Sequence, residues 1–135
     1  MSDVLWTTAS DSRFIDHGDG TVTDRHTGLM WQQETAHSEH TWEEAVKYCK
    51  TLKLGGHEDW RLPSIRELQS IVDHSRYDPA IDPVFSAKSS WYWSSSSYVF
   101  ITDHAWVVSF HVGLVFHDVK SFPSYVRAVR GKGEA

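Results

Sequence analysis

The sequence predicts an α+β fold, in which two helices pack on short antiparallel sheets joined by long loops. Three observations lead to this class: strand-like segments come first, two capped helices occupy the middle, and strand-like segments return at the end. The chain has 135 residues, a usual size for one core, so we expect a single domain over 1–135. Its composition, 40% hydrophobic and 23% charged, is that of a globular protein.

The first part of the chain predicts a β-meander. Residues 13–15, 21–23 and 29–31 are short apolar or β-branched segments, which favour strands. Glycine-containing turns at 17–20 and 24–28 separate these segments and let the chain reverse.

Two helices follow, each with a capping-box signal. Thr41 and Glu44 have the capping-box spacing, and apolar residues then recur at helical intervals, which predicts a helix over 41–53. Gly55 and Gly56 end it. Ser64 and Glu67 repeat the same signal and begin a second helix.

The rest of the chain predicts a loop and several strands. Residues 75–90 contain two prolines and form the loop, and apolar segments at 91–93, 105–110, 114–116 and 125–130 favour strands. Because strands stand at both ends of the fold, we expect the first and the last to pair and to bring the termini together.

Composition and charge exclude several classes of function. The formal net charge of -5 argues against a nucleic-acid partner, and no basic amphipathic stretch or long apolar run predicts membrane insertion. Met1–Trp6 lacks the features of a signal peptide, and Cys49 is the only cysteine, so no intrachain disulfide can form. Two compartments stay open: the chain remains inside the cell, or it is a domain of a longer exported protein.

Several segments, in order over residues 13 to 131, form one recognisable set: Gly18–Asp24, Thr27–Trp31, Thr41–Cys49, His57–Pro63, Arg66–Leu68, Trp93–Ser95 and Tyr125–Gly131. Together they resemble one bacterial family, DUF1566, also called the C-terminal domain of the Legionella collagen-like adhesin. The resemblance implies a C-type-lectin-like fold and a tendency to bind ligands, and it implies no reaction. Members of this family often carry a second cysteine near the C-terminal strand, where this chain has Ala128. A disulfide between the helix and that strand is therefore absent here.

The C-terminal third carries apolar residues where strand alternation expects solvent-facing ones. If Phe110 and Val108 point to the core, then Val107, Ser109 and His111 face outward. If Val115 points inward, then Leu114 and Phe116 lie outside. Aromatic residues mixed with small polar ones on such a face are typical of a binding surface.

The residue usage of 96–124 is also unusual. Apart from Trp106 and Lys120, this segment contains no Lys, Glu, Gln, Met or Trp. Every other residue type in it can be reached from an asparagine codon by changing its adenines. This pattern resembles the variable region of a diversity-generating retroelement, whose variable proteins typically use a C-type-lectin-like fold. On this interpretation the scaffold positions are Ser94, Ser95, Ala105, Trp106, Gly113, Val115 and Lys120.

We therefore expect a non-enzymatic domain that binds a protein or glycan ligand on another cell or surface. The predicted ligand-binding residues are Val99, Phe100, Ile101, Thr102, Asp103, His104, Ser109, His111, Val112, Leu114, Phe116, His117, Asp118, Val119, Ser121, Phe122 and Ser124. The alternative is an adhesin or lectin-like module with one fixed ligand. If the composition of this segment arises by chance, or if the outward apolar residues pack beneath a loop, there is no such binding surface.

The sequence gives weaker evidence for metal-binding and catalytic sites. Asp16, Asp19 and Asp24 fit turn formation better than a calcium loop. The cluster of His104, His111, His117 and Asp118 is a possible zinc or nickel site, but surface residues are the simpler interpretation, and we expect neither metal nor cofactor. We also expect no catalytic residues, because Cys49 lies on an apolar helix face and the serine run at 94–97 lacks triad partners.

Overall fold

The structure is a computed structural model and describes residues 12–132. Its first sheet is antiparallel, with strands in the order β1-β2-β3-β7. These are β1 (Phe14–Asp16), β2 (Thr21–Asp24), β3 (Met30–Gln32) and β7 (Val129–Arg130). The predicted meander is confirmed. The expected pairing of the first and last strands is wrong: β7 pairs with β3, so β1 and β7 lie at opposite edges of this sheet.

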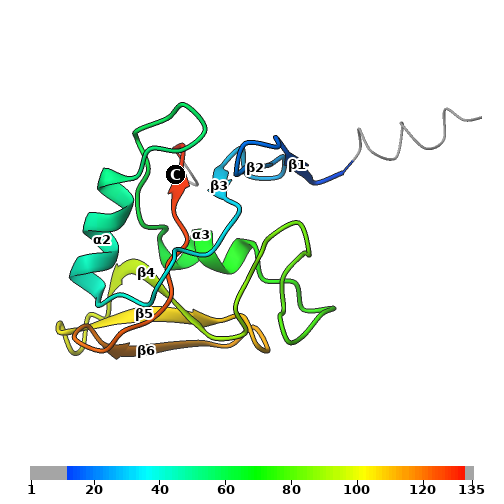
Figure 1. Cartoon of the computed structure of the whole chain (residues 1–135). Coiled ribbons are helices and arrows are strands. Elements are labelled where there is room, and N and C mark those ends of the chain that lie inside the picture. Colours follow the sequence, from blue (N-terminus) through cyan, green and yellow to red (C-terminus); the bar gives the residue numbers. More distant parts are fainter. Residues whose placement is uncertain (1–11, 133–135) are drawn as a thin grey trace, which may run out of the picture.

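The second sheet consists of β4 (Trp91–Ser97), β5 (His104–Ser109) and β6 (Val115–Val119), also antiparallel. Its order is β4-β5-β6, so β6 is an edge strand. Figure 1 shows this sheet at the bottom of the molecule, away from β1–β3, with β6 lowest. The face beneath β6 is therefore available for contact with another molecule.

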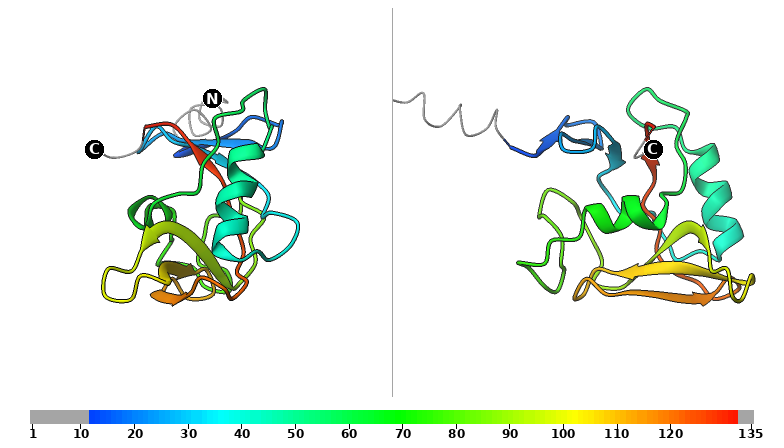
Figure 2. Two further views of the ribbon diagram at one scale, coloured as in Figure 1. Left: turned by 90° about the vertical axis from the view of Figure 1, so that its left-hand side faces the viewer. Right: turned by 180° about the vertical axis from the view of Figure 1, so that it is seen from behind.

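Two helices, α2 (Trp42–Thr51) and α3 (Ile65–Ser70), stand above the second sheet (Figure 2). Both capping boxes are present: Thr41 and Ser64 each accept from the backbone N–H three residues on, and Glu44 and Glu67 accept from the cap N–H in return. The helix predicted over 41–53 ends at Thr51, because Leu52 already has an extended backbone. Neither helix has the length and apolar character that crossing a bilayer requires.

The core consists of two clusters of buried side chains. One surrounds Trp31, Tyr92 and Phe110 and includes the apolar face of α3. The other surrounds Trp93 and includes Cys49 of α2. Both faces of β5 are consequently covered: Val108 belongs to the first cluster and Val107 to the second.

The last segment of the fold is mostly not a strand. Within the predicted strand at 125–130, only Val129 and Arg130 form a ladder, with β3. Tyr125 makes an isolated parallel bridge to Tyr92 of the second sheet. The segment thus connects the two sheets instead of running along one of them.

Together these observations confirm the α+β class, with two small antiparallel sheets and two helices in the described residues.

Candidate functional site

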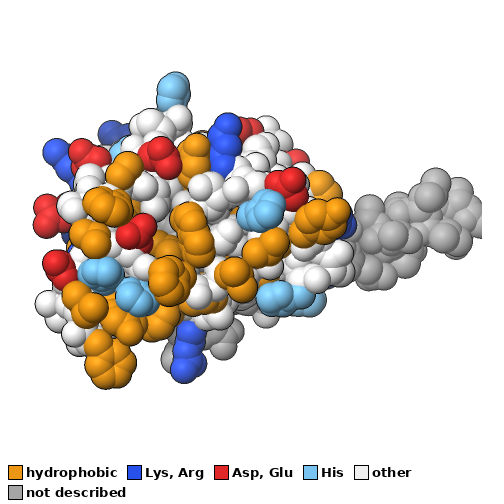
Figure 3. All heavy atoms as spheres, turned by 90° about the horizontal axis from the view of Figure 1, so that it is seen from below, with side chains coloured by type: hydrophobic (Ala, Val, Ile, Leu, Met, Phe, Trp, Pro, Cys, Tyr) orange, Lys and Arg blue, Asp and Glu red, His pale blue; other side chains and the backbone are white. Residues whose placement is uncertain are grey.

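Most of the predicted ligand-binding residues lie on or beside the edge strand β6, and we call this area the β6 surface. It comprises the β4–β5 hairpin (98–103), the β5–β6 hairpin (110–114), β6 itself and the turn that follows it (120–122). Figure 3 views the molecule from below and shows hydrophobic side chains spread over this face, with histidines among them.

The β4–β5 hairpin presents the most exposed apolar side chains. Val99 is 77% exposed and Phe100 is 82% exposed, and Ile101 beside them is also exposed. Tyr98 lies beneath this tip, with its ring centroid 5.0 Å from that of Trp106 and 5.6 Å from that of Phe100. The tip is thus anchored by a half-buried ring while its apolar ends face solvent. Thr102 and Asp103 complete the hairpin and are exposed.

The other end of the β6 surface is the β5–β6 hairpin. His111, Val112 and Leu114 are exposed there, while Phe110 is fully buried. The predicted split between an inward Phe110 and an outward Leu114 is confirmed. Phe116 lies between the two ends, on β6, with over half of its side chain exposed and its ring 6.3 Å from that of Trp91.

The turn after β6 adds two exposed residues, Ser121 and Phe122. Its backbone is tied to the first hairpin, because the Lys120 N–H donates to the carbonyl of Asp103 at 2.8 Å. Residues 99–103 and 119–122 therefore form one end of the surface, although almost twenty positions separate them along the chain.

Two predicted residues do not lie on the surface. Ser109 is only 5% exposed and Ser124 only 3% exposed, so the expectation that they face solvent is wrong. The alternation that turned Ser109 outward is wrong for Val107 as well, which is 1% exposed and belongs to the core. Strand alternation failed for Ser109 because β5 is the central strand and both of its faces are packed. Ser124 is enclosed by an antiparallel bridge to His40.

Four predicted residues of the surface are half-buried: His104, His117, Asp118 and Val119. The Nδ1 atoms of His104 and His117 are 3.0 Å apart, a hydrogen-bond distance. Tyr98 stacks on the His117 ring with centroids 3.9 Å apart and planes 6° from parallel. His111 is at the opposite end of the sheet, so the predicted cluster of three histidines does not assemble; its nearest acidic partner is Asp78, at 3.8 Å.

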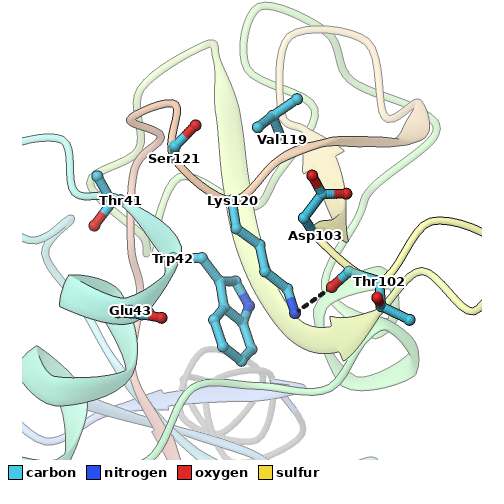
Figure 4. Close-up of a pocket in the computed structure, with 8 residues that line it drawn as sticks. All are labelled: Thr41, Trp42, Glu43, Thr102, Asp103, Val119, Lys120 and Ser121. Carbon is cyan, nitrogen blue, oxygen red and sulfur yellow. Dashed lines mark hydrogen bonds between the residues drawn. The ribbon is translucent and has the colours of Figure 1, made fainter.

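A pocket of about 570 Å³ opens at the end of the surface where the first hairpin meets α2 (Figure 4). Its lining joins four predicted residues to Lys120 and to three residues at the start of α2 for which the sequence carries no site signal. The lining residues are Thr41, Trp42, Glu43, Thr102, Asp103, Val119, Lys120 and Ser121. Helical spacing places Trp42 on the apolar face of its helix and gives no signal of a pocket. Because it stands in the first turn of α2, part of its ring reaches the pocket, a placement that only the tertiary structure reveals.

Lys120 crosses this pocket with its charge held in place. Its ammonium lies 4.1 Å from the centre of the Trp42 ring and donates to Ser97 Oγ at 2.8 Å and to the carbonyl of Thr102 at 2.9 Å. Farther along the chain, Arg127 is fully buried, and Arg130 is paired with Asp59 at 2.6 Å. These three basic residues therefore offer little free positive charge to a ligand.

Within residues 12–132, no group of three or more His, Cys, Asp or Glu side chains is placed to hold a metal. Asp19 accepts a hydrogen bond from the Thr21 N–H and Asp24 accepts one from the His26 N–H, as turn formation predicts. Asp24 is also paired with Arg13. Burial raises the pKa of the Cys49 thiol to about 12, so this cysteine is a poor nucleophile.

Comparison with known proteins supports the resemblance that the sequence motifs carry. The model of the Lcl C-terminal domain family matches residues 20–130. No curated protein matches the chain. Since the matched range covers well over half of the sequence, the chain belongs to the Lcl C-terminal domain family.

Proposed function

We propose that this chain is a non-enzymatic ligand-binding module with a C-type-lectin-like scaffold, and that the β6 surface is the variable region of a diversity-generating retroelement protein. One observation carries the proposal: within a single segment, most residues expected to vary are exposed, while most residues expected to be constant hold the fold. Such a division lets a binding surface change without loss of the scaffold.

The scaffold side of this division is visible in the packing. Ser94 and Ala105 have no exposed surface, and Ser94 Oγ donates to the carbonyl of Trp106 at 2.7 Å. Gly113 has a positive φ of 85°, and an added Cβ there would lie 2.8 Å from Val72. Ser95 is the exception, since it is exposed.

The variable side has the character of a protein-binding surface. Phe100, Leu114, Phe116 and Phe122 are each more than half exposed, and burying such side chains in a partner's pockets supplies much of the free energy of typical interfaces. Lys120 is held by Trp42, Arg127 is buried and Arg130 is paired with Asp59, so this surface offers little free positive charge and a polyanionic ligand is disfavoured. A largely uncharged protein surface fits best.

Sequencing the DNA around the gene tests the proposal. We expect a near-copy of the codons for residues 94–130, with adenines at the codons of the exposed residues, and a reverse transcriptase gene beside it. The mismatched codons should fall on positions such as Phe100 and Phe116 and should spare Ser94 and Ala105. Mismatches spread evenly over buried and exposed positions would contradict the proposal, as would the absence of any near-copy.

Membership of the Lcl C-terminal domain family favours a second function, an adhesin module with one fixed ligand. In that case the neighbouring DNA holds no template, and the β6 surface has the same sequence in different isolates. A binding screen against glycans and surface proteins then identifies the ligand. Phe116→Ser should weaken that binding, whereas Ile15→Ser, which removes an exposed apolar side chain from the other sheet, should not.

A further inference from the structure

A half-buried histidine pair on the β6 surface brings two potential metal-ligating nitrogens together, at a distance that also allows a hydrogen bond. His104 belongs to β5 and His117 to β6, and they stand on adjacent strands at diagonal positions, since His117 pairs with Trp106. Their Nδ1 atoms are 3.0 Å apart, and their ring planes are inclined by 51°. Each Nδ1 that carries no proton has a lone pair directed into this narrow gap.

The spacing of the two nitrogens matches the adjacent positions of a square-planar or tetragonal metal ion. With metal–nitrogen bonds of roughly 2.0–2.1 Å and an angle of about 90°, two such ligands lie about 2.9 Å apart. A tetrahedral ion would separate them to roughly 3.3 Å. The observed 3.0 Å is closer to the first value, which is the geometry that Cu²⁺ and Ni²⁺ prefer.

We infer that His104 and His117 form an open two-histidine site for a tetragonal transition-metal ion, with Cu²⁺ preferred to Ni²⁺ and Ni²⁺ to Zn²⁺. The proton that now lies between the rings moves to Nε2 of its own ring, and each ring turns until its Nδ1 lone pair points at the ion and no longer along the line between the two nitrogens. Water or a group of a bound ligand fills the remaining positions, because no third protein ligand is placed nearby among the described residues. This inference does not depend on the proposed function.

The surroundings favour a fixed position for the pair. Tyr98 stacks on the His117 ring, and Trp106 meets the same ring edge-on, with centroids 5.9 Å apart. Ligand side chains held in place by packing lose less freedom when they bind, which raises the affinity for the ion. The affinity should fall on acidification, because protonated imidazoles cannot bind a metal.

Titration of the untagged full chain with CuCl₂, NiCl₂ and ZnCl₂ tests the inference by calorimetry. We expect one saturable Cu²⁺ site per chain, weaker binding of Ni²⁺ and weaker still of Zn²⁺, and an electron paramagnetic resonance spectrum of the copper form with two nitrogen ligands. His104→Gln and His117→Gln should each abolish that site. His111→Gln, which removes an exposed histidine at the far end of β5, is the matched control and should keep it.

Two results would overturn the inference: no saturable site in the natural sequence, or a site that survives both substitutions. If either variant fails to fold, the natural sequence still decides. Substoichiometric Cu²⁺ should broaden the imidazole NMR signals of His104 and His117 before those of the other histidines, and broadening that begins elsewhere would contradict the assignment.

Discussion

At the scale of single residues, buried polar side chains stabilise this fold alongside the apolar core. Asp24 has no exposed surface and accepts two hydrogen bonds from Arg13, at 2.9 and 2.8 Å, and one from the His26 N–H. Burial raises the pKa of Asp24, but the Arg13 and His26 hydrogen bonds outweigh it, so the pKa lies below its ordinary value of 3.8. A carboxylate with a depressed pKa stabilises the fold above that ordinary value, and the contribution is lost as the pH falls further.

Asp24→Asn should therefore lower the free energy of unfolding at pH 7 by roughly 1–3 kcal/mol, because it removes charge-assisted hydrogen bonds at a buried position. The loss should shrink as the pH falls below about 3.8, because the unfolded chain takes up the proton there first and the folded state takes it up only at its lower pKa. Asp59→Asn is the control, since Asp59 pairs with Arg130 but is 62% exposed, and it should cost under about 1 kcal/mol. Urea denaturation at pH 7 and pH 3 measures both, and equal effects of the two variants would refute this account.

Residue-level prediction from the sequence succeeded where local signals decide and failed where packing decides. Leu114 and Phe116 are apolar at positions where strand alternation expects solvent-facing residues, and both are exposed. Ser109 obeys an alternation that assumes one solvated face, whereas its strand is covered on both faces. No pattern in the sequence distinguishes a central strand of this kind from an edge strand, so its burial could not be foreseen.

At the scale of elements, the helices were predictable and the edges of the sheets were not. Thr41 with Glu44, and Ser64 with Glu67, determine where each helix begins through contacts only three residues apart. The pairing of β7 with β3 depends on contacts between residues about 100 positions apart, for which the sequence carries no local signal. The pocket beside α2 also has no local signal in the sequence, because Trp42 and Lys120 meet only in the folded chain.

The β5–β6 hairpin allows a prediction at this scale. Gly113→Ala should destabilise the fold by roughly 1–3 kcal/mol, because the residue has a positive φ and the new methyl group would meet Val72 at 2.8 Å. Gly28→Ala is the matched control: its φ is also positive, at 78°, but nothing lies within 4 Å of its added Cβ. Thermal unfolding should show the smaller loss for Gly28→Ala, and a loss as large as that of Gly113→Ala would mean that contact with Val72 contributes nothing.

At the scale of the whole molecule, one buried arginine joins the parts of the fold. Arg127 lies in the segment that connects the two sheets, and its guanidinium donates to the carbonyls of Gln32, Gln33 and Ser86. It also lies over the Phe85 ring, 4.9 Å from its centre. The scaffold beneath the β6 surface therefore depends on a side chain that reaches both the end of β3 and the loop before β4.

Arg127→Lys should destabilise the whole fold by at least about 2 kcal/mol, because a single ammonium cannot reach the oxygens that the planar guanidinium serves. Arg130→Lys changes a surface arginine three residues on and should have a much smaller effect. Chemical denaturation followed by both tryptophan fluorescence and circular dichroism measures the loss. If Arg127→Lys unfolds like the natural sequence, the guanidinium does not hold these parts together.

The central claim is that the β6 surface binds ligands and can change in sequence while the scaffold stays folded. A displayed library tests this claim most directly. Its randomised positions would be 99–103, 111, 112, 114, 116, 121 and 122, and it would be selected against several unrelated proteins. The account predicts that most members fold, with unfolding midpoints near that of the natural sequence, and that selection yields specific binders for different targets. A library that is largely unfolded, or that folds but yields no binders, would contradict it.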